Sequence, residues 1–163
     1  MESLELFPIE LYYLILDFCE FKAKINFIQT CKYYYSNLYI YDLMNVESKY
    51  LSLLNDNILQ QNKFKLVTKL NANYNTEITD VSFMKNLTEL YGNGNCGINE
   101  KGIKGLSLVK LDVYSNTKIT NVSFMKNLTE LNASGSCGIN QEGIEGLSLI
   151  KLNTFGNAKI NNI

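Results

Sequence analysis

Histidine and tryptophan are absent from this 163-residue sequence, and Pro8 is its only proline. Without histidine, the chain lacks the commonest general base, cannot activate a serine or cysteine nucleophile through an imidazole, and cannot hold zinc through one. We therefore expect no enzyme activity, no metal site and no cofactor.

A surplus of charge of either sign is also missing, because 15 lysines and arginines stand against 16 aspartates and glutamates. This balance removes the usual electrostatic reason to expect a nucleic acid or an anionic membrane as a partner. The apolar stretch at 11–18 is too short to cross a bilayer and contains Asp17. The N-terminus carries Glu2 and Glu5 where a secretion signal would carry basic residues. We expect an intracellular protein.

An internal repeat is the strongest feature that is present. The segment at residues 79–90, TDVSFMKNLTEL, returns at 120–131 as TNVSFMKNLTEL, an offset of 41 residues. Each block divides again, because leucines are spaced alternately by 20 and 21 residues at Leu70, Leu90, Leu111, Leu131 and Leu152. The five segments around these leucines share the frame L-x-x-L-x-φ-x-x-N-x-x-I, where φ is apolar or small. Such a period is typical of a solenoid of short stacked turns.

The frame resembles the leucine-rich-repeat family over residues 64–163. This resemblance implies one short parallel strand per turn, on the concave face of the solenoid. Period-two alternation independently places Leu70 and Ala72 inward and their polar neighbours outward. The segments between strands are long enough only for 3-10 or single-turn helices. An asparagine after each strand should turn the chain and satisfy backbone groups: Asn75, Asn95, Asn116 and Asn157, with Ser136 in the remaining turn.

The residue before each inward leucine alternates in sign, in the order Lys69, Glu89, Lys110, Glu130 and Lys151. In parallel strands about 5 Å apart these neighbours would lie side by side, and each exposed pair would contribute under about 1 kcal/mol. The row disfavours a slip by one turn, although an ordinary solvated row of charges would look the same.

The cysteines contain no C-x-x-C pair and are spread over the chain as Cys19, Cys31, Cys96 and Cys137. Cys96 and Cys137 are equivalent in successive blocks, so they should lie two strands apart and should not form a disulfide. With no adjacent histidine or arginine, neither has a means of lowering its pKa. We expect reduced and mostly buried thiols.

The first 45 residues differ in kind from the repeats. A first helix is expected after Pro8, because proline suits the first position of a helix and apolar residues then recur at helical spacing at Leu11, Leu14, Ile15 and Phe18. Further helices are expected over 24–31 and from Lys32. Three segments resemble motifs of the F-box family: Phe7-Pro8-Ile9-Glu10, Ile15-Leu16-Asp17-Phe18-Cys19 and Thr30-Cys31-Lys32-Tyr33-Tyr34. The resemblance implies binding to a Skp1-like adaptor protein through Pro8, Leu11, Ile15, Leu16, Ile28, Cys31 and Lys32.

Together these features predict an α+β repeat fold, with N-terminal F-box-like helices followed by a short leucine-rich-repeat solenoid. The expected parts are an F-box-like domain at 4–45, a linking helix at 46–65 and about four and a half repeats at 66–163. The repeat style resembles F-box and repeat proteins of mimivirus-like giant viruses, which implies the host cytoplasm. The resemblance further implies a substrate-recognition adaptor of an SCF-type ubiquitin ligase. The alternative is a stand-alone protein-binding scaffold whose N-terminal helices only cap the solenoid.

Outward strand residues offer a surface for the unknown target protein. Tyr91, Tyr114 and Phe155 are large where solvent-facing residues are usually small or polar, and aromatic residues are enriched among interface anchors. Scattered exposed aromatics also occur by chance. The predicted target-binding set is Tyr91, Asp112, Tyr114, Asn132, Asn153 and Phe155.

Two further features have structural explanations. The stretch Gly92–Gly97 spells G-x-G-x-x-G, but Gly102 and Gly105 interrupt the helix that a dinucleotide site requires, so we attribute the spacing to repeat geometry. The pattern also stops within a turn, because residues 160–163 match residues 78–81, although solenoids normally end in a polar cap. Either a second copy covers the last apolar layer in a dimer, or the sequence is a shortened gene product.

Overall fold

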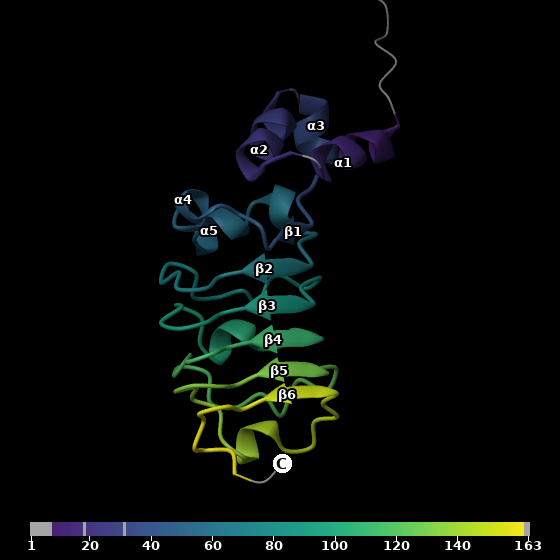
Figure 1. Cartoon of the computed structure of the whole chain (residues 1–163). Helices are drawn as coiled ribbons and strands as arrows, with labels where there is room; N and C mark the ends of the chain where they lie inside the picture. Colours follow the sequence, from purple (N-terminus) through teal and green to yellow (C-terminus); the bar gives the residue numbers. More distant parts are fainter. Residues whose placement is uncertain (1–7, 18, 31, 162–163) are drawn as a thin grey trace, which may run out of the picture. The chain divides into compact units, whose positions relative to one another are not determined.

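The computed structural model describes residues 8–17, 19–30 and 32–161, which divide into two compact units after Tyr39. The first unit contains helices α1 (Ile9–Asp17), α2 (Phe21–Gln29) and α3 (Lys32–Asn37) (Figure 1). α1 begins directly after Pro8, as expected for a proline at a helix start. None of the helices in the described ranges has the length and apolar character needed to cross a membrane.

An aromatic cluster packs the first unit, with one ring from each helix. Tyr12 of α1, Phe27 of α2 and Tyr34 of α3 have ring centroids 4.9 to 6.0 Å apart, and the Tyr34 hydroxyl donates to the Tyr12 hydroxyl at 3.2 Å. α1 therefore buries Tyr12 and Leu16, one helical turn apart. A different stripe of α1 is left exposed by 44%, 58% and 50%, at Leu11, Leu14 and Ile15 respectively.

The second unit is built on one parallel sheet of six short strands, stacked in sequence order along one side of the unit (Figure 1). The strands are β1 (Asp42–Leu43), β2 (Lys69–Asn71), β3 (Glu89–Tyr91), β4 (Lys110–Asp112), β5 (Glu130–Asn132) and β6 (Lys151–Asn153). The register aligns the repeated leucines, Leu70 with Leu90, then Leu111, Leu131 and Leu152. The predicted parallel-strand solenoid is thereby confirmed.

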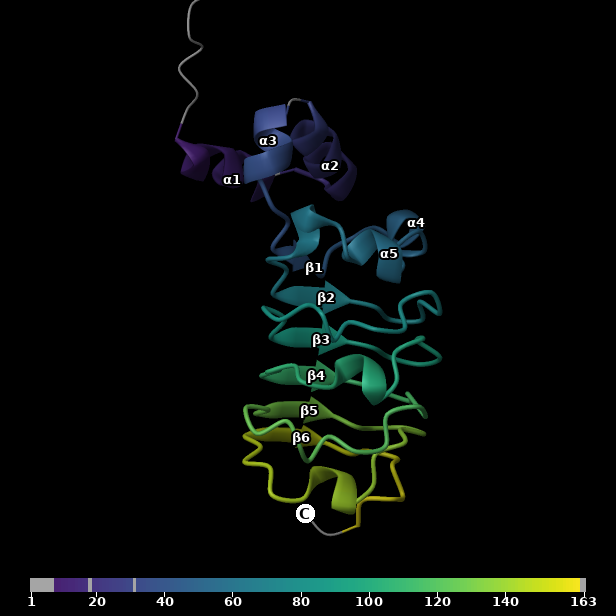
Figure 2. The ribbon, with the colours of Figure 1, turned by 180° about the vertical axis from the view of Figure 1, so that it is seen from behind.

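The aligned leucines lie in the core. Leu70 and Leu90 are fully buried, Leu111 and Leu131 almost so, and Leu152 of the last turn is half-buried. From β2 onward the described connections contain turns and two one-turn 3-10 helices, η2 (Lys101–Ile103) and η3 (Glu142–Ile144) (Figure 2). The expectation of short connecting elements is confirmed.

The beginning of the stack differs from the prediction. β1 lies inside the range expected for the helical domain, yet it pairs with β2 by aligning Asp42 with Lys69 and Leu43 with Leu70. In place of one linking helix over 46–65 there are α4 (Ser48–Leu51), α5 (Asp56–Leu59) and η1 (Asn62–Phe64). Asn55 breaks the helical run because its backbone is extended and its Oδ1 accepts from Ile58 N at 3.0 Å, which starts a new helix.

The turn asparagines satisfy buried backbone groups, as predicted, but only in alternate turns. Asn116 is fully buried, its Nδ2 donates to Gly92 O at 2.9 Å and to Ile98 O at 3.3 Å, and its Oδ1 accepts from Lys118 N. Asn157 repeats this arrangement one block later with Ala133 O and Ile139 O. Asn75 does the same at the start of the stack, with Leu51 O and Leu54 O.

The prediction for Asn95 is wrong, because its side chain is exposed, and Ser136, which replaces the asparagine one block later, is exposed as well. In their turns the backbone makes the contact to the preceding turn directly, and Gly138 N donates to Asn116 O at 2.8 Å. This approach requires glycine, since a Cβ on Gly138 would lie 2.6 Å from Ile119 O and 2.7 Å from Thr117 O. The side chain at the preceding position is then Cys137, which is buried.

We predict that Asn116→Ala and Asn95→Ala differ sharply in effect although the two positions are equivalent in the repeat. Asn116→Ala leaves two buried carbonyls without a donor and should lower the free energy of unfolding by about 3 kcal/mol. Asn95→Ala should change it by less than about 0.5 kcal/mol. Urea unfolding followed by circular dichroism measures both. Equal effects would contradict the alternation of the two kinds of turn.

Candidate protein-interaction surface

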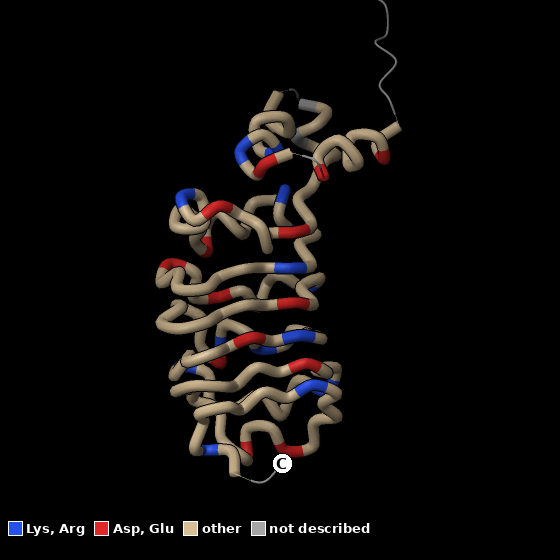
Figure 3. The backbone as a smooth tube through the Cα atoms, in the orientation of Figure 1, with Lys and Arg blue, Asp and Glu red and all other residues tan. Residues whose placement is uncertain are grey.

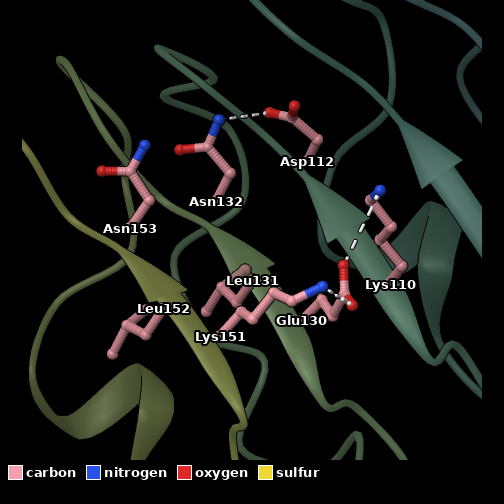
Figure 4. Close-up of a pocket in the computed structure, with 8 residues that line it drawn as sticks. All are labelled: Lys110, Asp112, Glu130, Leu131, Asn132, Lys151, Leu152 and Asn153. Atoms are coloured by element: carbon pink, nitrogen blue, oxygen red, sulfur yellow. Dashed lines mark hydrogen bonds and ion pairs between the residues drawn. The ribbon is translucent and has the colours of Figure 1, made fainter.

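The outward residues of the strands form a surface that we call the strand face. Its first row, the charged row, consists of the residues that precede the inward leucines, and its second row consists of the residues that follow them. Because the strands are parallel and in register, each row runs straight across the sheet. Figure 4 shows both rows over β4, β5 and β6, where the side chains line a shallow depression.

The residues of the charged row are aligned with alternating sign, as predicted, and the row is one member longer than the sequence indicated. Lys69 Nζ lies 2.9 Å from Glu89 Oε1, and Glu130 receives Lys151 at 2.6 Å and Lys110 at 3.7 Å. Asp42 of β1 lies beside Lys69, so that the alternation in sign begins with an acid (Figure 3). These groups are largely solvated, so the pairs specify register more than they add stability.

Shifts in pKa follow from these contacts. The hydrogen bond from Lys151, together with the charges of Lys151 and Lys110, holds the pKa of Glu130 below its usual value. The hydrogen bond to Glu89 and its charge raise the pKa of Lys69. The pKa of Lys110 is raised chiefly by Tyr91, whose ring centroid lies 5.3 Å from Lys110 Nζ. Tyr91 is therefore held against the charged row and is only half-exposed.

The second row uses much of its polar capacity internally. Asn132 Nδ2 donates to Asp112 Oδ1 at 2.9 Å, and Asn132 Oδ1 accepts from Ser134 Oγ at 2.6 Å. Asn153 Oδ1 accepts from Phe155 N at 3.1 Å. These side chains fix the ends of the strands and the turns that follow. The aromatic side chains at the ends of the strands remain exposed.

Three aromatic side chains are well exposed where the strands end: Tyr74 by 64%, Tyr114 by 44% and Phe155 by 87%. The ring of Tyr114 lies over Gly135, because a Cβ there would come within 2.8 Å of the ring. Tyr74 packs in the same way against Gly94. Sequence reasoning missed Tyr74 because the repeat frame puts it in a turn. The φ of 57° at Tyr74 turns its side chain away from the line of the strand. Gly94, one turn later, was the sequence feature that could have indicated a ring packed against it.

The predicted target-binding set is thus brought together on one face, over β3 to β6. Tyr114, Asn153 and Phe155 are exposed, whereas Tyr91, Asp112 and Asn132 are half-exposed. The residues of the predicted adaptor-binding set differ in exposure. Pro8, Leu11 and Ile15 are exposed, Leu16 and Ile28 are buried, Cys31 lies outside the described residues, and Lys32 is the first residue of α3.

The cysteines and glycines of the repeats serve packing. Cys96 and Cys137 are free, buried thiols, and burial raises the pKa of both. In the G-x-G-x-x-G stretch, Gly94 takes a left-handed turn at φ 65° and Gly97 packs against the carbonyls of Thr76 and Ile78. Within the described ranges, no group of three acidic or cysteine side chains is placed to hold a metal ion.

Compared with known proteins, the sequence matches no family model and no curated protein. Two exposed surfaces are the candidate interaction sites, namely the apolar stripe of α1 and the strand face.

We predict that the pKa of Glu130 depends more on Lys151 than on Lys110. The ordinary pKa of the carboxyl is 4.5, and the pKa of Glu130 in the folded protein should be lower. Glu130 therefore stabilises the folded state at pH values above the ordinary pKa, and this stabilisation is lost as the pH falls through the lowered pKa. Lys151→Gln should raise the Glu130 pKa more than Lys110→Gln does, and salt should reduce both effects. NMR titration of the Glu130 side-chain carboxyl measures this. An unchanged pKa in Lys151→Gln would contradict the pairing.

Proposed function

We propose that the protein is a substrate-recognition adaptor of an SCF-type ubiquitin ligase, in which the first unit binds a Skp1-like adaptor protein and the leucine-rich-repeat solenoid binds a target protein. The observation that carries the proposal is the exposed apolar stripe of α1. Leu11, Leu14 and Ile15 are neighbours on a helix surface, and all are close to half-exposed or more. Contiguous exposed apolar side chains on a small helical unit mark an interaction site.

The identity of the partner comes from the F-box resemblance. Leu11 and Ile15 belong both to the exposed stripe and to the set that the resemblance assigns to the adaptor. The described residues of the first two motif segments lie at the start and the end of α1, and those of the third lie at the start of α3. An adaptor of this kind holds two proteins near one another and needs no catalytic group of its own, since other subunits transfer the ubiquitin.

The strand face supports the target-binding half of the proposal. It offers exposed aromatic anchors, Tyr114 and Phe155, beside a row of charges that is close to neutral overall. A surface with aromatic anchors and paired charges suits a folded protein or peptide partner. It gives no electrostatic attraction for nucleic acid.

A stand-alone scaffold is the rival function, and one observation favours it. Leu16 and Ile28, which the F-box resemblance assigns to the adaptor contact, are buried at 4% and 0% exposure. They serve the interior of the described structure and cannot reach a partner without rearrangement. On this reading the first unit has a structural role and no adaptor binds.

We predict that the full chain retains a purified Skp1-like adaptor in a pull-down, and that Leu11→Ala combined with Ile15→Ala weakens retention at least tenfold. Both side chains are exposed, so truncation should leave the circular dichroism spectrum unchanged. Leu53→Ala, another exposed leucine in the second unit, is the matched control and should bind like the wild type. Failure of the wild type to bind, or equal binding by the double variant, would favour the scaffold.

We also predict that Tyr114→Ala combined with Phe155→Ala reduces capture of the target protein from expressing cells. Loss of two aromatic anchors should cost at least about 2 kcal/mol of binding free energy. Quantitative affinity purification compares this variant with Phe124→Ala, which removes an exposed aromatic outside the strands. A protein retained equally by both variants would not be bound through the strand face.

A further inference from the structure

A hollow of about 390 Å³ lies in the second unit at the end of β2. This strand runs toward the side of the sheet where α4 lies (Figure 1). The volume falls within the range of small-molecule sites, roughly 300–1,000 Å³. One wall comes from α4 and the residue after it, and the other from β2 and the turn that follows. The first wall consists of Ser48, Leu51 and Ser52, and the second contains Asn71, Asn73 and Tyr74.

Hydrogen bonds hold the two walls of the hollow together. Asn75, which also lines the hollow, is buried, and its Nδ2 donates to Leu51 O at 2.7 Å and to Leu54 O at 3.0 Å. The second wall is bonded to the next turn as well, because Asn73 Oδ1 accepts from Asn93 N at 3.0 Å. The shape of the hollow is therefore fixed by bonds within the second unit.

Tyr74 occupies a backbone position that a tyrosine rarely takes. Its φ is 57°, and the equivalent residues of the later turns, all with positive φ, are Gly94, Ser115, Gly135 and Gly156. A large side chain in this left-handed conformation is strained, and strain of this kind clusters at functional sites. The ring adds little to the core, because Tyr74 is exposed by 64%. The strain therefore points to a function for the exposed ring.

Uncharged polar groups share the hollow with this ring. The Ser48 hydroxyl, Asn73 Nδ2 and the Tyr74 hydroxyl have no hydrogen-bond partner among the described residues. The Ser52 hydroxyl donates to Lys49 O at 3.3 Å and can still accept. None of the described residues that line the hollow carries a charge. A ligand here would meet donors and acceptors but no counter-charge.

From the strained ring, the unpartnered polar groups and the lack of charge, we propose that the hollow binds one neutral sugar residue, a hexopyranose. The C–H face of a pyranose packs against the partly negative face of a tyrosine ring. The sugar hydroxyls both donate and accept, which suits the two serine hydroxyls and the N–H groups of Asn73. A nucleotide fits less well, because no cation would meet its phosphate. This binding is independent of the adaptor function proposed above.

The test follows the isotopically labelled full chain by NMR while the methyl β-glycosides of glucose, galactose, mannose and N-acetylglucosamine are added in separate titrations. At least one sugar should shift the side-chain amide of Asn73 and the backbone amides of Ser48 and Ser52, and the shifts should saturate. Adenosine is the comparison ligand, because it is also neutral and flat. Absence of saturable shifts with all four sugars, or tighter binding of adenosine than of any sugar, would overturn the proposal.

Three variants test the roles of the ring and the hydroxyl. Tyr74→Gly should weaken sugar binding at least tenfold and leave the circular dichroism spectrum unchanged, because glycine adopts this φ without strain. Ser48→Ala should weaken it about threefold, as for one neutral hydrogen bond. Ser115→Gly is the matched control, since it relieves the same φ outside the hollow, and it should bind within twofold of the wild type. Undiminished binding by Tyr74→Gly, or an equal loss in Ser115→Gly, would contradict the role of the ring.

Discussion

A turn of about twenty residues cannot bury its own apolar side, and the rest of the solenoid follows from this constraint. Each inward leucine is covered only when the next turn is placed directly above it, in register, with a parallel strand alongside. That arrangement buries Leu70, Leu90 and Leu111 in one continuous interior. It also aligns every other position of the repeat, so that the charged residues interact across adjacent strands, whereas the buried asparagines and cysteines recur in alternate turns.

The rows show that two kinds of turn alternate. One kind carries a lysine before the strand and a buried asparagine after it, as at Lys110 and Asn116. The other carries a glutamate before the strand and replaces the asparagine with glycine and a buried cysteine, as at Glu130 and Gly138. Each kind complements the other in charge and in backbone hydrogen bonding. The structural unit is therefore the block of two turns.

Much of this organisation could be predicted from the sequence, because a repeated residue has a repeated environment. The inward leucines, the charged row, the buried Cys96 and Cys137 and the short connections are all confirmed. The first strand could not be predicted, since Asp42 and Leu43 belong to a turn that no longer resembles the others. The exposure of Asn95 was also missed. Asn95 matches the repeat frame in sequence. Only the close approach of Gly97 to the preceding turn shows that the Asn95 side chain lies outside the position that Asn116 fills in the next turn.

The candidate surfaces were less predictable than the core, because exposure depends on how unlike elements pack. The helical spacing of Leu11 and Ile15 does not reveal that Tyr12 and Leu16 supply the buried face of α1 instead. The strand face exists only if the leucines of the second unit are stacked in register, and δ-methyl-labelled leucines test this stack directly. Adjacent parallel strands lie about 4.8 Å apart, so NMR should show methyl–methyl contacts from Leu70 to Leu90, from Leu90 to Leu111 and from Leu111 to Leu131. Methyl groups of Leu90 without contacts to both of its neighbours would contradict the stack.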